Sequence, residues 1–310
     1  MNQSPISPST GLTVNQGRLL VVLAAVFWSL SGAFTKILMQ QAFFRLDGAP
    51  ITAVQIAFFR VFFAGLVLLP TLRRSDISVR WSMPLMVVCF AVMNATFVPA
   101  LAWGTAANAI LLQYSAPLWM YLASIYLLGE APDRRGAVSL AFGMFGILII
   151  LCGGWQEAQF GVISIALASG FAYAGIILFL RVLRDSSTRW LTVINHLGGA
   201  LFILPALIYF APAWPTPAQM TLLFFFGAVQ MALPYFLIAR GLRVVSAQEA
   251  GAITLLEPLL NPLWAYLVAP EVEQPRLYTM LGGVFILGGL LWRYWPRKRT
   301  AVEQTVDSSH

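Results

Sequence analysis

The stretch AQEAGAITLLEPLLNPLWAYLVAP, residues 247–270, places the carboxyl group of Glu257 and two inner prolines within a long hydrophobic run. About 20 apolar residues cross the ~30 Å hydrocarbon layer of a membrane, and a carboxyl group at that depth costs roughly 2.5–3.5 kcal/mol on insertion scales. Pro258 and Pro262 have no amide hydrogen, so the carbonyls of Thr254 and Pro258 lose their helical partners. Glu257, these carbonyls and Asn261 therefore predict a polar site that lies inside protein or beside a wet cavity.

Other polar side chains fall at the same depth when residues are counted at about 1.5 Å each from the span ends. Arg60 and Glu257 allow two interpretations: a structural ion pair that braces the two halves, or a proton carrier or substrate contact at Glu257. His196 titrates in the range that a proton-driven transporter would use, although a membrane histidine is more often a packing residue. The coupling or ion-pair candidates are Arg60, His196 and Glu257. The predicted cavity residues are Trp28, Asn94, Gln113, Tyr114, Gln230, Tyr235 and Asn261.

Aromatic residues accompany these polar groups. Trp28, Tyr114 and Tyr235 either pack structurally or stack on an apolar or aromatic ligand. Lys36 is expected to extend to the outer interface in a structural role. Neither a metal site nor a cofactor is predicted, because no second histidine or carboxylate stands at metal-ligand spacing.

The composition indicates that these groups are positioned by the helices of a membrane protein. Hydrophobic residues make up 59 % of the 310 residues, charged residues 10 %, and the mean hydropathy is +0.78, whereas soluble domains carry about 25 % charged residues. The net charge of +7 predicts no nucleic-acid binding, because the basic residues lie between the hydrophobic runs.

Ten runs predict ten spans: residues 18–40, 50–70, 83–104, 106–129, 135–153, 160–182, 189–211, 217–240, 246–269 and 276–295. The third and fourth are separated at Gly104 and Thr105, since one helix of that length would not fit a bilayer.

The distribution of positive charge predicts the orientation. With the N-terminus in the cytoplasm, all but four of the 19 Lys and Arg residues fall on the cytoplasmic side. The exceptions are Arg45 and Arg276 outside and Lys36 and Arg60 within spans. An inner-membrane protein with both termini in the cytoplasm is therefore expected.

An internal repeat appears when the chain is shifted by 141 residues. Pro117 then falls on Pro258, and Glu130 falls on Glu271. Five spans per half is an odd number, so the second half enters from the opposite side. The predicted organisation is an N-terminal tail (1–17), two inverted five-helix repeats (18–153 and 154–295) and a C-terminal tail (296–310). Glycines in the last span of each repeat predict close helix packing, either as scaffold or as the face of a homodimer.

Three motifs resemble one family. They are the P-L-W run that begins at Pro117 and ends at Glu130, E-P-L-L-x-P-L-W from Glu257, and F-F-R-x-x-x-A from Phe58. Together with ten spans in two halves they are similar to the EamA branch of the drug/metabolite transporter superfamily. The resemblance implies an inner-membrane secondary transporter, commonly an exporter of amino acids or related metabolites, with a central cavity between the inner helices of both halves. The expected partners are a small-molecule substrate and membrane lipid, and proton coupling is a hypothesis that rests on Glu257 and His196.

Enzymatic motifs are missing from the sequence, among them HExxH, GxSxG and the P-loop. The alternative to a transporter is a scaffold or a lipid-modifying membrane enzyme. An enzyme would cluster its acid, base and nucleophile near one interface, whereas the polar groups here are predicted at mid-depth. Alternating access of a central cavity is the mechanism that fits this placement.

Overall fold

A computed structural model describes residues 12–40, 48–156, 159–210, 213–274 and 276–295. The predicted tails, apart from residues 12–17, and Arg45 lie outside these ranges. The first half consists of α1 (Val14–Trp28), α2 (Ser31–Gln40), α3 (Ala53–Leu68), α4 (Ser82–Trp103), α5 (Ala106–Gln113), α6 (Ala116–Tyr126) and α7 (Arg134–Gln156). The second half consists of α8 (Phe160–Val182), α9 (Thr188–Phe210), α10 (Pro217–Phe225), a π-helical stretch (Phe226–Ala232), α11 (Leu233–Gly241), α12 (Ala247–Thr254), α13 (Leu256–Val268) and α14 (Leu277–Tyr294).

The described residues contain nine helices that are long and apolar enough to cross a membrane. The fourth predicted span is not among these nine, and it is divided into α5 and α6 at Tyr114 and Ser115. The first and ninth spans are also interrupted, between α1 and α2 and between α12 and α13. The expected separation of the third and fourth spans is confirmed: α4 ends at Trp103, and the Thr105 hydroxyl caps the amide of Asn108 in the first turn of α5. The described residues form an all-helical membrane protein with nine candidate spans, and the pair α5 and α6 provides the expected tenth.

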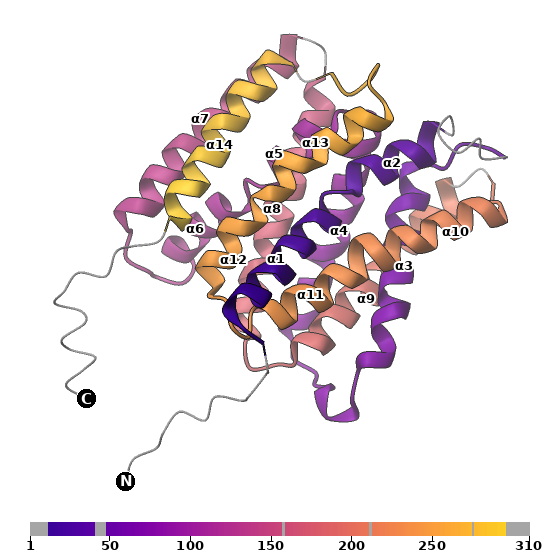
Figure 1. The fold of residues 1–310 in the computed structure, drawn as a ribbon, viewed down its shortest axis with the longest axis horizontal. Coiled ribbons are helices and arrows are strands. Elements are labelled where there is room, and N and C mark those ends of the chain that lie inside the picture. Colours follow the sequence, from indigo (N-terminus) through magenta and orange to yellow (C-terminus); the bar gives the residue numbers. More distant parts are fainter. Residues whose placement is uncertain (1–11, 41–47, 157–158, 211–212, 275, 296–310) are drawn as a thin grey trace.

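Helix packing shows that the two halves are inverted repeats. The last spans, α7 and α14, lie side by side (Figure 1), and the second spans, α3 and α9, also contact each other. The third span of the first half, α4, packs on the first span of the second half, α8; in return α11 packs on α1. Each contact is thus either shared between equivalent helices or repeated with the halves exchanged.

The 141-residue offset aligns the helix breaks as well. The break after Tyr114 corresponds to the break at Leu255 between α12 and α13. In each half a proline follows soon after the break, Pro117 in α6 and Pro258 in α13, and it cannot donate to the preceding turn. The π-helical stretch Phe226–Ala232 likewise ends just before Pro234. Prolines therefore open the helices at mid-membrane in both halves.

The glycines of α7 and α14 are used within one chain. Gly146 and Gly282 lie so close that a Cβ atom on either would meet the backbone of the other helix. These glycines therefore form the scaffold contact that the sequence predicted as one of two interpretations.

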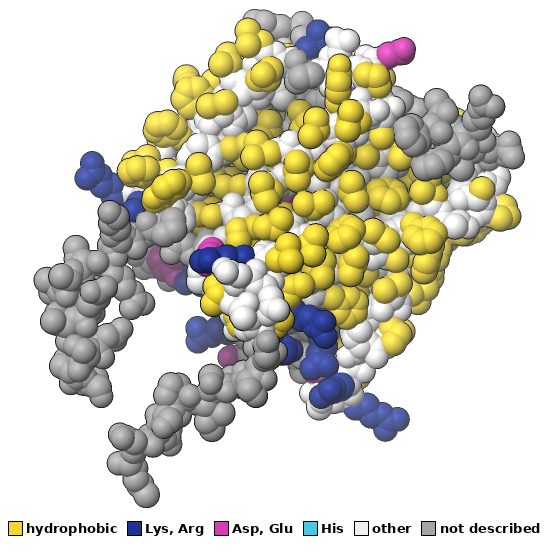
Figure 2. All heavy atoms as spheres, viewed as in Figure 1, with side chains coloured by type: hydrophobic (Ala, Val, Ile, Leu, Met, Phe, Trp, Pro, Cys, Tyr) yellow, Lys and Arg dark blue, Asp and Glu magenta, His cyan; other side chains and the backbone are white. Residues whose placement is uncertain are grey.

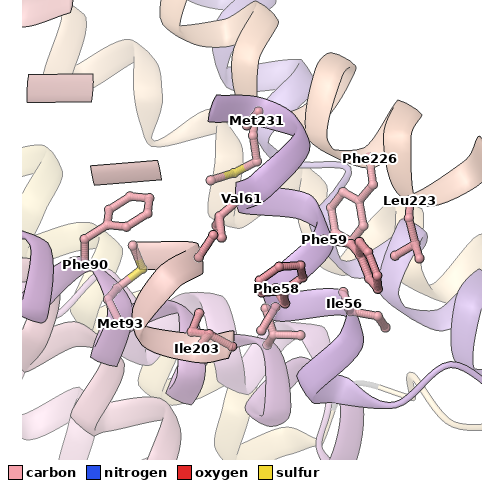
Figure 3. Packing of buried hydrophobic residues seen from close by; sticks show 14 of the residues in the cluster. Ile56, Phe58, Phe59, Val61, Phe90, Met93, Ile203, Leu223, Phe226 and Met231 are labelled. Atoms are coloured by element: carbon pink, nitrogen blue, oxygen red, sulfur yellow. The ribbon is translucent and has the colours of Figure 1, made fainter. Parts of the chain in front are cut away.

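A large apolar core lies beside α3. Figure 3 shows Ile56, Phe59 and Val61 of α3 against Phe226 and Met231 of the π-helical stretch, in the third span of the second half. On the face of the molecule in Figure 2, hydrophobic side chains cover most of the surface, whereas Lys and Arg gather toward the end where α1 begins. We call this end the terminal face; it carries residues 14, 68, 182, 241 and 294. The opposite end, with residues 40, 103, 156 and 268, is the distal face.

On the terminal face, Asp76 joins two loops. Its carboxylate accepts hydrogen bonds from the backbone amide of Arg73 and the hydroxyl of Ser187, each at 2.9 Å, and these bonds lower the pKa of Asp76 below its ordinary 3.8. A lowered pKa stabilises the fold at all pH values above 3.8, and the contribution disappears as the pH falls through the lowered value. Asp76→Asn is therefore expected to lower the melting temperature in detergent at about pH 7, and the difference should shrink as the pH falls below 3.8. A difference between the proteins that is independent of pH would contradict this assignment.

Candidate functional site

A cavity of about 290 Å³ lies at mid-membrane between the two repeats. Its polar lining comes from both halves, namely Trp28, Arg60, Gln113, Tyr114, Tyr173, Thr188, Thr192, Asn195, His196, Gln230, Tyr235 and Glu257. A second hollow of about 270 Å³ shares Tyr114 and Glu257 with it and continues to Gly251 and Tyr294. Because Thr188, Gly251 and Tyr294 stand near the terminal ends of their helices, the cavity opens toward the terminal face.

Arg60 forms the basic wall of the cavity. Its side chain is 2 % exposed, its Nη2 donates to Asn94 Oδ1 at 2.6 Å, and its guanidinium lies 5.6 Å from the ring centres of Phe97 and Phe226. The other two nitrogens, Nε and Nη1, have no hydrogen-bond partner among the described residues. A buried guanidinium with two free donors is costly unless an acceptor fills the site.

Glu257 forms the acidic wall. The hydroxyl of Tyr114 lies 2.7 Å from Glu257 Oε2 and 2.9 Å from the carbonyl oxygen of Thr254. Thr254 is the residue whose carbonyl Pro258 deprives of a helical donor, so the predicted free acceptor is confirmed and Tyr114 supplies its partner. Within the described chain, no Lys or Arg lies within 4.0 Å of Glu257. The carboxylate of Glu257 can therefore bind a proton or pair with a cationic ligand.

Three further polar groups complete the lining. His196 is fully buried and its Nδ1 lies 2.8 Å from the Thr192 carbonyl, so Nδ1 carries the proton and Nε2 is the acceptor. Gln230 donates to the carbonyl of Trp28, the last residue of α1, at 2.9 Å. His196 Nε2, Gln230 Oε1 and Asn195 Oδ1 have no partner in the described part of the chain. The buried acceptors and donors of this site therefore await water or a ligand.

Aromatic rings form the remaining walls. Trp28 and Tyr235 meet edge to face at 5.5 Å, and Tyr235 meets His196 at 5.2 Å. Tyr173 of α8 belongs to both hollows and was not predicted from the sequence. Tyr173 lies in a run of small and apolar residues. The signal that could have indicated it is its position three residues after Gly170, which places both residues on one face of α8.

The structure brings together nine of the ten predicted side chains, with Asn94 in contact through Arg60. Arg60 and Glu257 do not form a direct ion pair among the described contacts. Asn94 is the partner of Arg60 Nη2, and Tyr114 is the partner of Glu257 Oε2. Asn261 does not line the cavity. It is fully buried and its Nδ2 donates to the hydroxyl of Ser31 at 2.6 Å, between α13 and α2.

Lys36 also differs from expectation. Its side chain is 2 % exposed and lies 2.9 Å from Glu273 Oε1, so it does not extend to the interface. Together with the Asn261 contact, this ion pair closes the molecule between the cavity and the distal face. The notable difference between the two faces is therefore an open terminal side and a sealed distal side.

Two inverted repeats with a polar cavity between them, open to one face, are the arrangement of a membrane transporter. The sequence pattern of the EamA-like transporter family matches residues 15–152 and 159–295, so the chain belongs to this family and is not an enzyme.

Relatives support this assignment. An uncharacterized transporter of Archaeoglobus fulgidus is 28 % identical over 89 % of this chain and 96 % of its own length. The uncharacterized transporter YwfM of Bacillus subtilis is 24 % identical over 94 % of this chain and 97 % of its own. An S-adenosylmethionine uptake transporter of Rickettsia prowazekii is 23 % identical over 82 % and 86 %. A solved crystal structure with 16 % identity shares the fold at a TM-score of 0.63, covering 93 % of this chain and 100 % of its own.

Proposed function

We propose that this transporter exports a small zwitterion with an apolar or aromatic body, such as an amino acid, across the inner membrane by alternating access. The observation that carries the proposal is the arrangement of Arg60 and Glu257 on different walls of one cavity, each without an oppositely charged partner within 4.0 Å among the described residues. A carboxylate would accept the two free donors of Arg60, and an ammonium group would pair with Glu257.

The energetics favour a ligand with both charges. A ligand that carries one charge leaves either the guanidinium or the carboxylate uncompensated in a low-dielectric site, at a cost of several kcal/mol. Trp28, Tyr235 and Tyr173 supply apolar surface for the body of the ligand. Recognition by two fixed charges and an aromatic wall suits the amphipathic amino acids.

The proposed direction follows from the distribution of charge. Arg and Lys gather on the terminal face, which is the cytoplasmic side by the positive-inside rule. The cavity opens toward that face, so in this conformation it loads from the cytoplasm. Export then requires the cavity to open to the distal face in a second conformation.

S-adenosylmethionine is a second candidate substrate. The Rickettsia relatives are S-adenosylmethionine uptake transporters, and this molecule carries the same amino-acid group plus a sulfonium cation that the faces of Trp28 and Tyr235 would attract. The purified transporter in proteoliposomes distinguishes the candidates. We would load separate vesicles with a labelled aromatic amino acid or with labelled S-adenosylmethionine, and measure exchange of each against unlabelled amino acids, their amides, their decarboxylated amines and S-adenosylmethionine.

The proposal expects exchange with the zwitterions and about tenfold weaker competition by the amide and the amine, because each lacks one charge. Exchange with S-adenosylmethionine alone would replace the amino acid by the second candidate. No exchange by any of these compounds, in vesicles whose protein is folded, would overturn the zwitterion assignment.

Proton coupling gives a separate prediction. Glu257 and His196 are the titratable groups proposed to couple transport to protons, because both line the cavity and neither has a charged partner among the described residues. We expect flux through the unmodified protein to vary with pH, and the double variant Glu257→Gln, His196→Ala to lose this dependence. The measurement is flux in proteoliposomes at several pH values with a fixed substrate gradient. An unchanged pH dependence in the double variant would leave facilitated diffusion as the mechanism.

A further inference from the structure

The distal seal is built around one buried ion pair. Lys36 Nζ, from the middle of α2, lies 2.9 Å from Glu273 Oε1, in the loop after α13, and both side chains are at most 2 % exposed. We call these two residues the distal latch. Lys36 also donates to the carbonyl of Gly104 at 2.9 Å, and Glu273 Oε2 accepts from the backbone amide of Ala106 at 2.8 Å. The latch thus binds the link between α4 and α5, where α5 begins.

A second ion pair occupies the equivalent place on the terminal face. Arg181, near the end of α8, contacts Glu130, in the loop after α6. Because the repeats are inverted, α8 is the counterpart of α1 and α2, and α6 is the counterpart of α13. We call this pair the terminal latch. Unlike the distal latch, its side chains are 51 % and 40 % exposed.

The start of α12 is the counterpart of the site at the start of α5 where the distal latch docks. Shifted by 141 residues, Gly104 and Ala106 fall on Val245 and Ala247, and the N-cap Thr105 falls on Ser246, which caps α12 in the same way. The described contacts of Glu130 are with Arg181 and, through its backbone, Ser124. On the open face the latch is therefore formed but not docked, whereas on the sealed face it is both formed and docked.

We propose that docking of these two latches closes the two faces alternately. Docking of Lys36 and Glu273 on the start of α5 holds the distal face shut in the present conformation. In the opposite conformation the distal latch would leave α5 and become exposed, while Arg181 and Glu130 dock on the start of α12. The two charges of each latch stay paired in both states. The carboxylate of a latch, however, binds the first backbone amides of α5 or α12, which carry a partial positive charge, in one state only. This inference rests on the transport cycle of the proposed function and adds what controls it.

Thiol labelling from the distal side tests the inference without any substrate, so its outcome does not depend on which compound is carried. The reporter is Ala106→Cys in a background where both free cysteines, Cys89 and Cys152, are alanine. Ala106 is fully buried beneath the distal latch, and the substitution keeps the backbone amide that Glu273 binds. In right-side-out vesicles an impermeant maleimide is added from the distal side, and the labelling rate is measured.

Lys36→Met and Glu273→Gln each leave one buried group without its partner, and we expect each to raise the labelling rate at least tenfold. Glu130→Gln is the matched control on the terminal face, and it should not raise this rate, since its latch closes the other face. Glu273→Asp keeps the charge but is one methylene shorter, so it cannot reach both Lys36 and the amide of Ala106; it should give an intermediate rate even if the neutral variants fail to accumulate. Unchanged labelling in the folded Lys36 and Glu273 variants, or an equal increase in Glu130→Gln, would overturn the proposal.

Discussion

Replacing Arg60 with Leu is expected to weaken binding of a zwitterionic substrate by about 100-fold. The substitution removes two free donors from the cavity wall and leaves the substrate carboxylate unpaired, and losses of this kind cost about 2–5 kcal/mol, of which about 2.8 kcal/mol corresponds to 100-fold. Arg60→Lys should recover only part of the loss, because an ammonium group does not offer the forked pair of donors. Equilibrium binding of labelled substrate to protein in detergent measures the effect.

The same substitution should not destabilise the empty protein. Arg60 is buried with Nε and Nη1 unpartnered, so its removal relieves a desolvated charge, and the ligand-free melting temperature should stay equal or rise. Arg240→Leu, at an exposed arginine of α11, is the control and should bind substrate normally. The amide of the substrate, which has no carboxylate, should lose little affinity in Arg60→Leu. Binding of the zwitterion within threefold of the unmodified protein would contradict the assignment of Arg60.

The second large effect is expected at Gly170 of α8. A Cβ atom at this position would meet the carbonyl oxygen of Leu112 and the hydroxyl of Ser115, at the break between α5 and α6. Gly170→Leu would therefore force α8 away from the segment that carries Gln113 and Tyr114, and overpacking of this kind costs about 1–3 kcal/mol or more. We expect a clear fall in melting temperature together with loss of transport.

Gly161→Leu is the matched control for this substitution. Gly161 lies on the same helix, and a Cβ atom there meets nothing within 4 Å. The control should therefore melt and transport as the unmodified protein does. If Gly170→Leu and Gly161→Leu behaved alike, close packing of α8 on the helix break would not be what holds the cavity wall in place.

The sequence predicts this architecture because its strongest signals are local. Runs of apolar residues specify the crossings, and Pro258 specifies a free carbonyl at Thr254 wherever its helix lies. The 141-residue repeat aligned Pro117 with Pro258, and the structure has a helix break shortly before each of these prolines, after Tyr114 and at Leu255. Depth along a span is likewise a matter of counting residues, which is why most of the predicted polar residues do meet in one cavity.

Rotation about each helix axis and long-range pairing could not be predicted in this way. Asn261 lies at the depth of the cavity but faces Ser31, since helix orientation depends on packing with α2. The repeat placed Glu130 opposite Glu271, whereas the residue that takes the equivalent ionic role is Glu273. The two halves turn differently here: Gly129 adopts a left-handed φ of 67° after α6, and Pro270, which cannot, stands at the equivalent position after α13.

Labelling of Gln113→Cys by an impermeant thiol reagent, in the same cysteine-free background, tests most directly whether a hydrated substrate cavity lies at mid-membrane and opens to the terminal face. Gln113 lines the cavity at the level of Arg60 and Glu257. We predict rapid labelling when the reagent is added from the terminal face, slow labelling from the distal face, and protection by a saturating zwitterionic substrate. Complete protection from both faces in the folded, substrate-free protein would show a sealed helix contact and contradict the account.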